Sequence, residues 1–121
     1  MRLKNFLLVV EDIECSKAFY KDFFGLDVIR DFGTNVILAG GLVLQQRDGW
    51  EQLTGCETVF GGHNFELYFE TNDMTGFLQK IQTSAGEIRL LNEAETYADR
   101  QVVRLYDPDG HVIEVAGISK N

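Results

Sequence analysis

The chain is poor in the residues that mark several common protein classes. It has one proline, two cysteines and two histidines among its 121 residues. Cys15 and Cys56 stand far apart and form no CxxC motif or Cys/His cluster, so neither a disulfide framework nor a structural zinc site is indicated. We expect both cysteines to be buried or half-buried thiols.

Basic residues and long apolar runs are also scarce. The 11 Lys and Arg residues face 19 Asp and Glu residues, which gives a formal net charge of −8. Because an acidic surface opposes a phosphate backbone, we expect no nucleic-acid partner. The apolar run 6–10 ends at Glu11 and Asp12, far short of a membrane span or the core of a signal peptide. We therefore expect no membrane partner and a cytoplasmic location.

The remaining composition is sufficient for one compact domain. Hydrophobic residues make up 45% of the 121-residue chain, which allows one core but is too little for two independent ones. We predict a single domain over residues 1–121, made of two modules at approximately 1–50 and 60–117.

The first module is predicted to contain a strand, a helix and three further strands. The β-branched and aromatic run 5–10 is typical of a strand. Apolar residues then recur every three or four positions from Ile13 to Phe24, which predicts a helix capped by Asp12 and closed by Gly25. Strands are predicted at 26–32, 35–39 and 42–47, separated by Gly33 and by Gly40-Gly41.

The second module is predicted to repeat this order. Residues 64–70 have the composition of a strand, and apolar residues from Met74 to Ile81 mark one face of a helix that ends at Gly86. Segments 50–62 and 92–100 have no clear period and are interpreted as loops. Strands are predicted at 87–91, 101–106 and 112–116, the last two joined by the turn Asp107-Pro108-Asp109-Gly110. The repeated order βαβββ predicts an α+β fold of two tandem modules.

Two stretches of the sequence resemble the vicinal-oxygen-chelate superfamily. VVEDIECSKAFYKDFFGLDV, residues 9–28, is similar to the opening strand and helix of these proteins, and YDPDGHVIEV, residues 106–115, is similar to their closing hairpin. The superfamily includes glyoxalase I, extradiol dioxygenases, fosfomycin-modifying enzymes and bleomycin-resistance proteins. The resemblance covers nearly the whole chain. It implies two βαβββ modules whose curled mixed sheets form a cup for a small molecule.

Strand alternation indicates which polar side chains face that cup. Residues i and i+2 of a strand share a face, and the fully apolar face of each strand is expected to pack on a helix. The opposite faces carry four polar residues, Asn5, Gln45, Glu66 and Glu114. A carboxylate among apolar neighbours is costly unless it is paired, protonated or bound to a cation. The plainer alternative places both glutamates on the solvated rim of an antiparallel sheet.

The resemblance places these four residues at the metal-ligand positions of the superfamily. In glyoxalase-I-like members it implies a homodimer in which Asn5 and Gln45 face the partner subunit's Glu66 and the partner subunit's Glu114. A compact monomer that uses all four residues of one chain is the alternative. The implied cofactor is a divalent metal ion, namely Mg, Mn, Ni or Zn.

The ligand set departs from the usual pattern in its lack of histidine. Metal-binding members usually place histidine at one or both strand-start positions, where this chain has Asn5 and Glu66. An oxygen-only set suits Mg²⁺ or Mn²⁺ better than zinc. The lack of two histidines with a glutamate also argues against the iron(II) site of extradiol dioxygenases.

Four further residues are candidates for substrate binding. Tyr68, Trp50 and Phe60 would form an aromatic wall, unless they belong to the core. Arg104 shares a strand face with Val102. It either neutralises a substrate carboxylate, pairs with a cup glutamate or forms an ordinary surface salt bridge.

Three functions are compatible with these features. The leading hypothesis is a metal-assisted lyase or isomerase of glyoxalase type, acting on a small carbonyl or hemithioacetal, in which Glu66 or Glu114 moves the proton. The alternative is a non-catalytic binding protein of the bleomycin or antibiotic-resistance type, which the net charge of −8 favours. A third possibility is a sensor or scaffold that keeps the fold without either activity.

Overall fold

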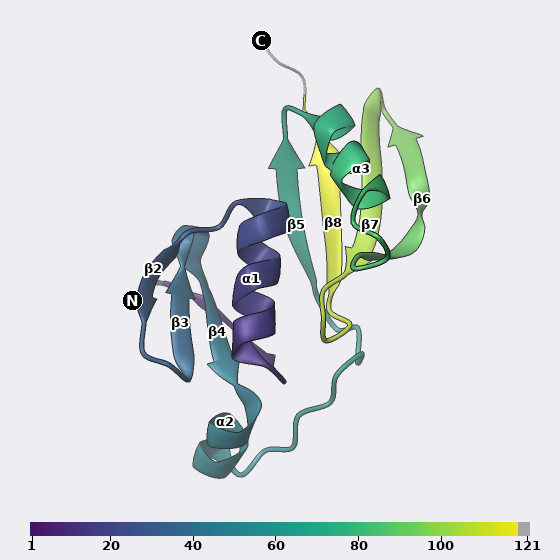
Figure 1. The fold of residues 1–121 in the computed structure, drawn as a ribbon. Helices are drawn as coiled ribbons and strands as arrows, with labels where there is room; N and C mark the ends of the chain where they lie inside the picture. The colour runs from purple at the N-terminus through teal and green to yellow at the C-terminus, as the bar shows by residue number, and fades with distance from the viewer. Residues whose placement is uncertain (119–121) are drawn as a thin grey trace. The chain divides into compact units, whose positions relative to one another are not determined.

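The computed structural model describes residues 1–118 of the chain, so the last three positions of the predicted domain lie outside the described residues. The chain forms two compact units, Met1–Val59 and Phe60–Asn121. Each unit contains one four-stranded sheet (Figure 1). The grouping of both units into a single domain stays a prediction.

The first unit has the predicted order of a βαβββ module. Its sheet has the strand order β1-β4-β3-β2, in which β1 runs parallel to β4 and the other pairs are antiparallel. Its elements are β1 (Phe6–Val10), α1 (Ile13–Phe24), β2 (Val28–Asp31), β3 (Asn35–Leu38), the 3-10 turn η1 (Ala39–Gly41), β4 (Leu42–Gln46) and α2 (Arg47–Thr54).

Local interactions define both ends of α1. The Oδ1 atom of Asp12 accepts hydrogen bonds from the backbone N–H groups of Glu14 and Cys15, each at 3.1 Å. Gly25 has a φ of 66°, the left-handed conformation that glycine adopts most easily, and its N–H donates to the carbonyl of Lys21. Both predicted helix caps are therefore confirmed.

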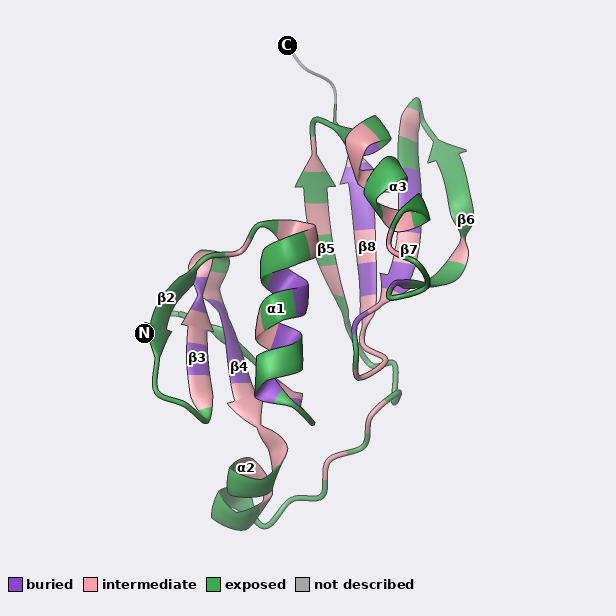
Figure 2. Cartoon of the chain, in the orientation of Figure 1, coloured by how far each residue is buried: buried purple, intermediate pink, exposed green. Residues whose placement is uncertain are grey.

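The core of the first unit lies between α1 and one face of its sheet. Leu8 and Val10, predicted to face the helix, are only 1% and 0% exposed, whereas Phe6 from the same predicted set is 45% exposed. Figure 2 shows buried positions along α1, β3 and β4. The other buried side chains here are Ile13, Ser16, Phe19, Tyr20, Val36, Leu38, Leu42 and Leu44.

The second unit repeats the module. Its sheet has the order β5-β8-β7-β6, with β5 parallel to β8 and the remaining pairs antiparallel. Its elements are β5 (Glu66–Thr71), α3 (Met74–Gln82), β6 (Arg89–Tyr97), β7 (Arg100–Tyr106) and β8 (Val112–Gly117). The predicted α+β class with two tandem βαβββ modules and mixed sheets is confirmed.

Helix α3 covers one face of the second sheet (Figure 1). Met74 on α3 is buried, as are Val103 and Leu105 on β7 and Ile113 and Val115 on β8. Because strand residues alternate between faces, Arg104 and Glu114 lie on the opposite face. This second face carries the candidate site.

Two segments predicted to be loops contain regular structure. Helix α2 occupies residues 47–54, so the loop prediction for 50–62 is wrong over its first part and Arg47 belongs to a helix instead of a strand. Strand β6 continues to Tyr97, and β7 begins at Arg100, so the loop prediction for 92–100 is wrong. Only Ala98 and Asp99 separate the two strands.

The turn at Ala98-Asp99, between β6 and β7, cannot be predicted from its residue types. The φ angles of Ala98 and Asp99 are 47° and 69°, and positive φ at both central residues is the mark of a type I′ turn. Asn-Gly and Asp-Gly are the usual signals for this turn. Ala-Asp gives no such signal, which explains why the sequence indicated a loop.

Smaller corrections concern the end of α3 and the two cysteines. Helix α3 ends at Gln82 instead of Gly86, with Thr83 as its C-cap, and the hydroxyl of Thr83 donates to the carbonyl of Gln79. Cys15 and Cys56 are exposed, so their predicted burial is wrong. Within residues 1–118, no helix has the length and apolar character needed to cross a membrane.

Candidate functional site

The open face of the second sheet carries a row of polar side chains from neighbouring strands. Tyr68 on β5 lies opposite Glu114 on β8, which lies opposite Arg104 on β7. Arg104 in turn lies opposite Asn92 on β6. Side chains at directly opposite positions share a face and lie close enough to interact. The sheet register therefore brings a carboxylate, a guanidinium and a phenol together.

Arg104 and Glu114 form an ion pair within this row. The Nη2 atom of Arg104 lies 2.6 Å from Oε1 of Glu114, and the two side chains are 31% and 16% exposed. A charge-assisted hydrogen bond of this length is stronger than a neutral one. Of the three roles considered for Arg104, the structure shows its pairing with a cup glutamate.

Glu66 lies beside this ion pair. It precedes Tyr68 by two residues on β5 and therefore shares the face of Glu114. Although Glu66 remains accessible to solvent, its pKa is raised above the ordinary value, first by partial loss of water and then by the charge of Glu114 and a hydrogen bond with it. The positive charge of Arg104 opposes this rise. Glu66 thus holds a proton to a higher pH than an isolated glutamate does.

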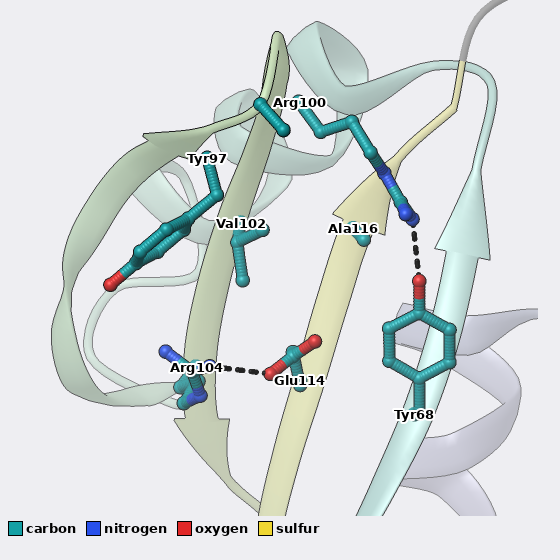
Figure 3. A pocket seen from close by; sticks show the side chains of 8 residues that line it. Tyr68, Tyr97, Arg100, Val102, Arg104, Glu114 and Ala116 are labelled. Atoms are coloured by element: carbon teal, nitrogen blue, oxygen red, sulfur yellow. Dashed lines mark hydrogen bonds and ion pairs between the residues drawn. The ribbon is translucent and has the colours of Figure 1, made fainter.

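A pocket of about 390 Å³ lies on the same face (Figure 3). Its volume falls within the range of small-molecule sites in proteins. Val102 and Ala116 lie opposite each other in the sheet and are both buried, so they form an apolar floor. The lining residues are Tyr68, Tyr97, Ala98, Arg100, Val102, Arg104, Glu114 and Ala116.

Arg100 is held at the other end of the pocket from Arg104. Its Nη2 atom donates to the hydroxyl of Tyr68 and to Oε2 of Glu70, the latter at 3.0 Å. Its Nε atom donates to the carbonyl of Gly117 at 3.2 Å. The hydroxyl of Tyr68 donates to the same Glu70 oxygen at 2.9 Å. These contacts fix the orientation of the guanidinium and of the Tyr68 ring.

Tyr97 forms a side of the pocket from β6. Its hydroxyl donates to Oε2 of Glu95 at 2.5 Å, and that carboxylate is the main reason why the pKa of Tyr97 is raised. Hydrogen bonding and charge from Arg104 act in the opposite direction. Tyr97 therefore keeps its proton, and its ring offers an apolar surface.

The structure does not bring Asn5 and Gln45 together in the first unit. The Oδ1 atom of Asn5 lies 3.9 Å from the position that a Cβ atom on Gly41 would take. Gln45 lies four residues after Gly41, which corresponds to about 13 Å along a strand. Its Oε1 atom accepts a hydrogen bond from Nδ2 of Asn35 at 2.9 Å. The metal-ligand roles of Asn5 and Gln45 stay predictions.

Two of the four predicted substrate-binding residues, Tyr68 and Arg104, line the pocket. Phe60 does not, and its ring lies edge-on to that of His111 at a centroid distance of 5.9 Å. Trp50 belongs to α2 in the first unit and does not line this pocket either. Binding of substrate by these residues stays a prediction.

Tyr97 and Arg100 are pocket residues that the sequence reasoning missed. Both fall in segment 92–100, which was interpreted as a loop, so no strand face was assigned to them. Arg100 has the same strand parity as Val102 and Arg104. Extending that alternation backwards by two residues would have identified it.

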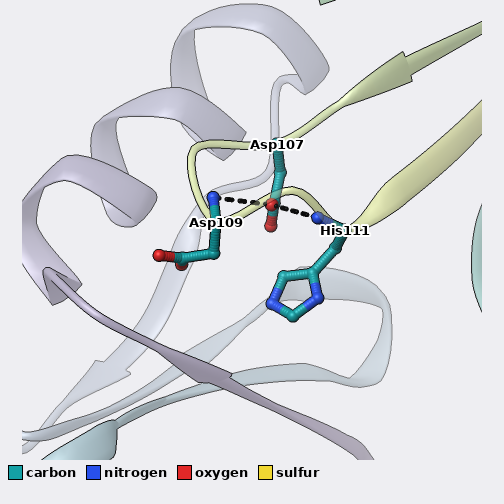
Figure 4. Close-up of side chains that lie close together, drawn as sticks. All are labelled: Asp107, Asp109 and His111. Atoms are coloured by element: carbon teal, nitrogen blue, oxygen red, sulfur yellow. Dashed lines mark hydrogen bonds between the residues drawn. The ribbon is translucent and has the colours of Figure 1, made fainter. Parts of the chain in front are cut away.

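A second group of potential metal ligands lies in the turn between β7 and β8 (Figure 4). One ligand atom from each of Asp107, Asp109 and His111 lies within 4.8 Å of the others. Asp107 is 1% exposed, and its Oδ1 atom accepts hydrogen bonds from the N–H groups of Asp109 and His111, each at 2.9 Å. This carboxylate therefore stabilises the predicted turn, which is confirmed.

Comparisons with known proteins agree with this architecture. The model of a glyoxalase-like domain matches residues 3–119. No match was found among curated proteins. A protein of unknown function from Agrobacterium tumefaciens strain C58 is similar in structure, with a TM-score of 0.82, 35% identity and coverage of 98% of this chain and 94% of that chain.

Two further solved structures carry functional names. A glyoxalase/bleomycin resistance protein/dioxygenase family enzyme from Burkholderia phytofirmans PsJN has a TM-score of 0.74, with 24% identity over 95% of this chain and 97% of that chain. A lactoylglutathione lyase from Agrobacterium tumefaciens has a TM-score of 0.70, with 20% identity over 96% and 92% of the two chains. At these identities the likeness concerns the fold.

Proposed function

This chain belongs to the glyoxalase-like domain family of the vicinal-oxygen-chelate superfamily, and from that membership we propose that it is a lyase or isomerase of glyoxalase type. Its substrate is a small carbonyl or hemithioacetal compound. The observation that carries this proposal is the placement of Glu66 and Glu114 on one face of the paired strands β5 and β8, the face that bears the pocket. The likeness to a lactoylglutathione lyase is consistent with it.

The two carboxyl groups have different environments and therefore different roles. Glu114 is paired with Arg104 at 2.6 Å, so its charge has a fixed partner. Glu66 has a raised pKa, because it is partly shielded from water and lies beside the charge of Glu114. A carboxylate with a raised pKa is a stronger base and is better suited to general base catalysis near neutral pH. Glu66 accordingly takes a proton from the carbon next to the carbonyl and returns it to the neighbouring carbon.

A divalent metal ion fits the donor chemistry of this pair. Two adjacent carboxylates repel each other, and a proton or a cation between them removes that cost. Glu66 and the Glu114 oxygen that does not contact Arg104 would hold the ion, and an oxygen-only set suits Mg²⁺ or Mn²⁺. When bound, the ion would polarise the substrate carbonyl.

A homodimer would complete this ligand set. Two carboxylates supply fewer oxygen atoms than Mg²⁺ or Mn²⁺ requires. A further ligand would be Asn5 of the partner subunit or Gln45 of the partner subunit, since the structure does not bring these two residues together. Formation of a dimer is thus part of the proposal, and sedimentation at twice the monomer mass is its direct measurement.

The experiment is an isomerisation assay on the hemithioacetal of methylglyoxal and glutathione, with protein loaded with Mn²⁺. We expect turnover that is lost on chelation and recovered on addition of metal. Replacing the base with an isosteric amide, Glu66→Gln, should lower kcat by about 100-fold or more, in line with general base catalysis. Glu93→Gln, an exposed glutamate on β6 outside the pocket lining, is the matched control. Unchanged turnover in Glu66→Gln would refute the assignment.

One observation favours non-catalytic binding as the second candidate. The ion pair between Arg104 and Glu114 already neutralises the most buried carboxylate of the site, and Tyr68 and Tyr97 supply aromatic surface for a drug-like ligand. This function predicts a rise in melting temperature with bleomycin that does not respond to chelator. A metal-dependent response supports the lyase or isomerase instead.

A further inference from the structure

Arg100, at one end of the pocket, keeps hydrogen-bond donors that no acceptor in the described part of the protein uses. A guanidinium group has five N–H donors and no acceptor. Arg100 uses Nε and Nη2 for its contacts with Gly117, Tyr68 and Glu70, and its Nη1 atom has no acceptor among residues 1–118. Both tyrosine hydroxyl hydrogens are already donated to glutamates. A ligand that satisfies this pocket therefore has to bring acceptors.

The apolar floor lies between the two guanidinium groups. Arg100, Val102 and Arg104 alternate along one face of β7, which separates the two arginine Cα atoms by about 13 Å. Val102 and its opposite neighbour Ala116 occupy the interval (Figure 3). A ligand that spans this distance has an apolar middle and a polar group at each end.

The carboxylates of the face do not favour a cationic ligand despite the net charge of −8. Glu114 is paired with Arg104, and Glu70 is paired with Arg100. Because these two ion pairs have no net charge, hydrogen-bonding capacity decides which ligand group binds at Arg100. A carboxylate accepts hydrogen bonds from the remaining N–H groups of Arg100, whereas an ammonium group has no acceptor to offer.

We propose that the pocket takes a small carboxylate-bearing compound whose apolar body lies on Val102 and Ala116 and whose carboxylate accepts hydrogen bonds from Arg100. The rings of Tyr68 and Tyr97 contact this apolar body. The inference rests on the proposed function, since it names the substrate class of the same site. The carbonyl end of the substrate then lies at Arg104 and Glu114, where the proton is moved.

The test is calorimetric titration with three probes built on the same phenylpropyl skeleton, namely 3-phenylpropanoate, 3-phenylpropanamide and 3-phenylpropylamine. We expect the carboxylate to bind at least 10-fold more tightly than the amide, and the amine to bind most weakly. Arg100→Gln should weaken carboxylate binding by about 10- to 100-fold, the range expected for charged hydrogen bonds. Its amide affinity should not change, which also shows that the variant is folded.

Arg89→Gln is the matched control. Arg89 belongs to β6, its guanidinium lies over the Tyr106 ring at 5.0 Å, and it does not line the pocket. This variant should bind the carboxylate as the unmodified protein does. Equal binding of the three probes, or tighter binding of the amine, would overturn the inference.

The titration separates the inference from the proposed function. Calorimetry measures carboxylate affinity without turnover, and the isomerisation assay measures turnover separately. Carboxylate selectivity without turnover would support the inference and defeat the lyase or isomerase. Turnover without carboxylate selectivity would support the lyase or isomerase and defeat the inference.

Discussion

Arg104 on β7 and Glu114 on β8 lie directly opposite each other in the second sheet and are joined by a 2.6 Å ion pair. Both side chains are more than half shielded from solvent. Glu66 lies close enough for Glu114 to raise its pKa and for Arg104 to lower it. The three residues therefore form one electrostatic unit, in which changing either Arg104 or Glu114 alters the pKa of Glu66.

Charge changes at the two neighbours of Glu66 should move its pKa in opposite directions. Arg104→Gln removes a positive charge and should raise the pKa of Glu66 further, because a positive neighbour stabilises the carboxylate. Glu114→Gln removes a negative charge and should lower it. Titration of ¹³C-labelled glutamate carboxyl groups by NMR measures both shifts. Shifts of the same sign in the two variants would contradict the coupling.

The raised pKa of Glu66 also makes folding stability depend on pH. Between the unfolded pKa and the higher folded pKa, the native state binds more protons than the unfolded state, so this group's stabilising contribution is lost as the pH rises. Glu66→Gln removes the contribution. The free energy of unfolding of the unmodified protein should therefore fall relative to that of Glu66→Gln as the pH rises from about 4 to 7.

Urea unfolding at intervals of half a pH unit measures this difference. Glu93→Gln is again the control, because Glu93 is an exposed glutamate on β6, outside the pocket lining. Its stability should parallel that of the unmodified protein over the same range. A rise in the stability of the unmodified protein relative to Glu66→Gln would mean that the pKa of Glu66 is lowered instead.

Asp107 should be essential for stability even though it lies in a turn. It is 1% exposed and accepts hydrogen bonds from the N–H groups of Asp109 and His111. Asp107→Ala leaves two donors unsatisfied and should lower the free energy of unfolding by about 2–4 kcal/mol. Asp107→Asn retains an acceptor oxygen and should cost less. Equal costs in urea unfolding would show that the acceptor is not the reason for the burial of Asp107.

The sequence predicted the parts of this fold that depend on periodic burial and strong turn signals. Leu8 and Val10, the caps at Asp12 and Gly25, and the turn at Asp107 all follow from local patterns. The proximity of Glu66 and Glu114 required pairing of β5 with β8 across an intervening helix and hairpin. Strand alternation alone identified their face but not their distance.

Part of the pocket could not be predicted from the sequence, because the turn between β6 and β7 has unusual residue types. Arg100 and Tyr97 pair directly across that turn, and both line the pocket. A sequence indicates a positive φ only where the residue type favours that conformation, as glycine does. Ala98 and Asp99 adopt the conformation without the residue types, so their position could be found only from the structure.

The same mismatch predicts that the turn can be stabilised. A φ of 47° is unfavourable for alanine, whereas asparagine and glycine adopt this conformation more easily. The double change Ala98→Asn and Asp99→Gly should raise the free energy of unfolding by about 1 kcal/mol. Ala98→Val, which places a β-branched residue at positive φ, should lower it. Urea unfolding measures both effects, and stabilisation by valine would show that the loop is not a type I′ turn.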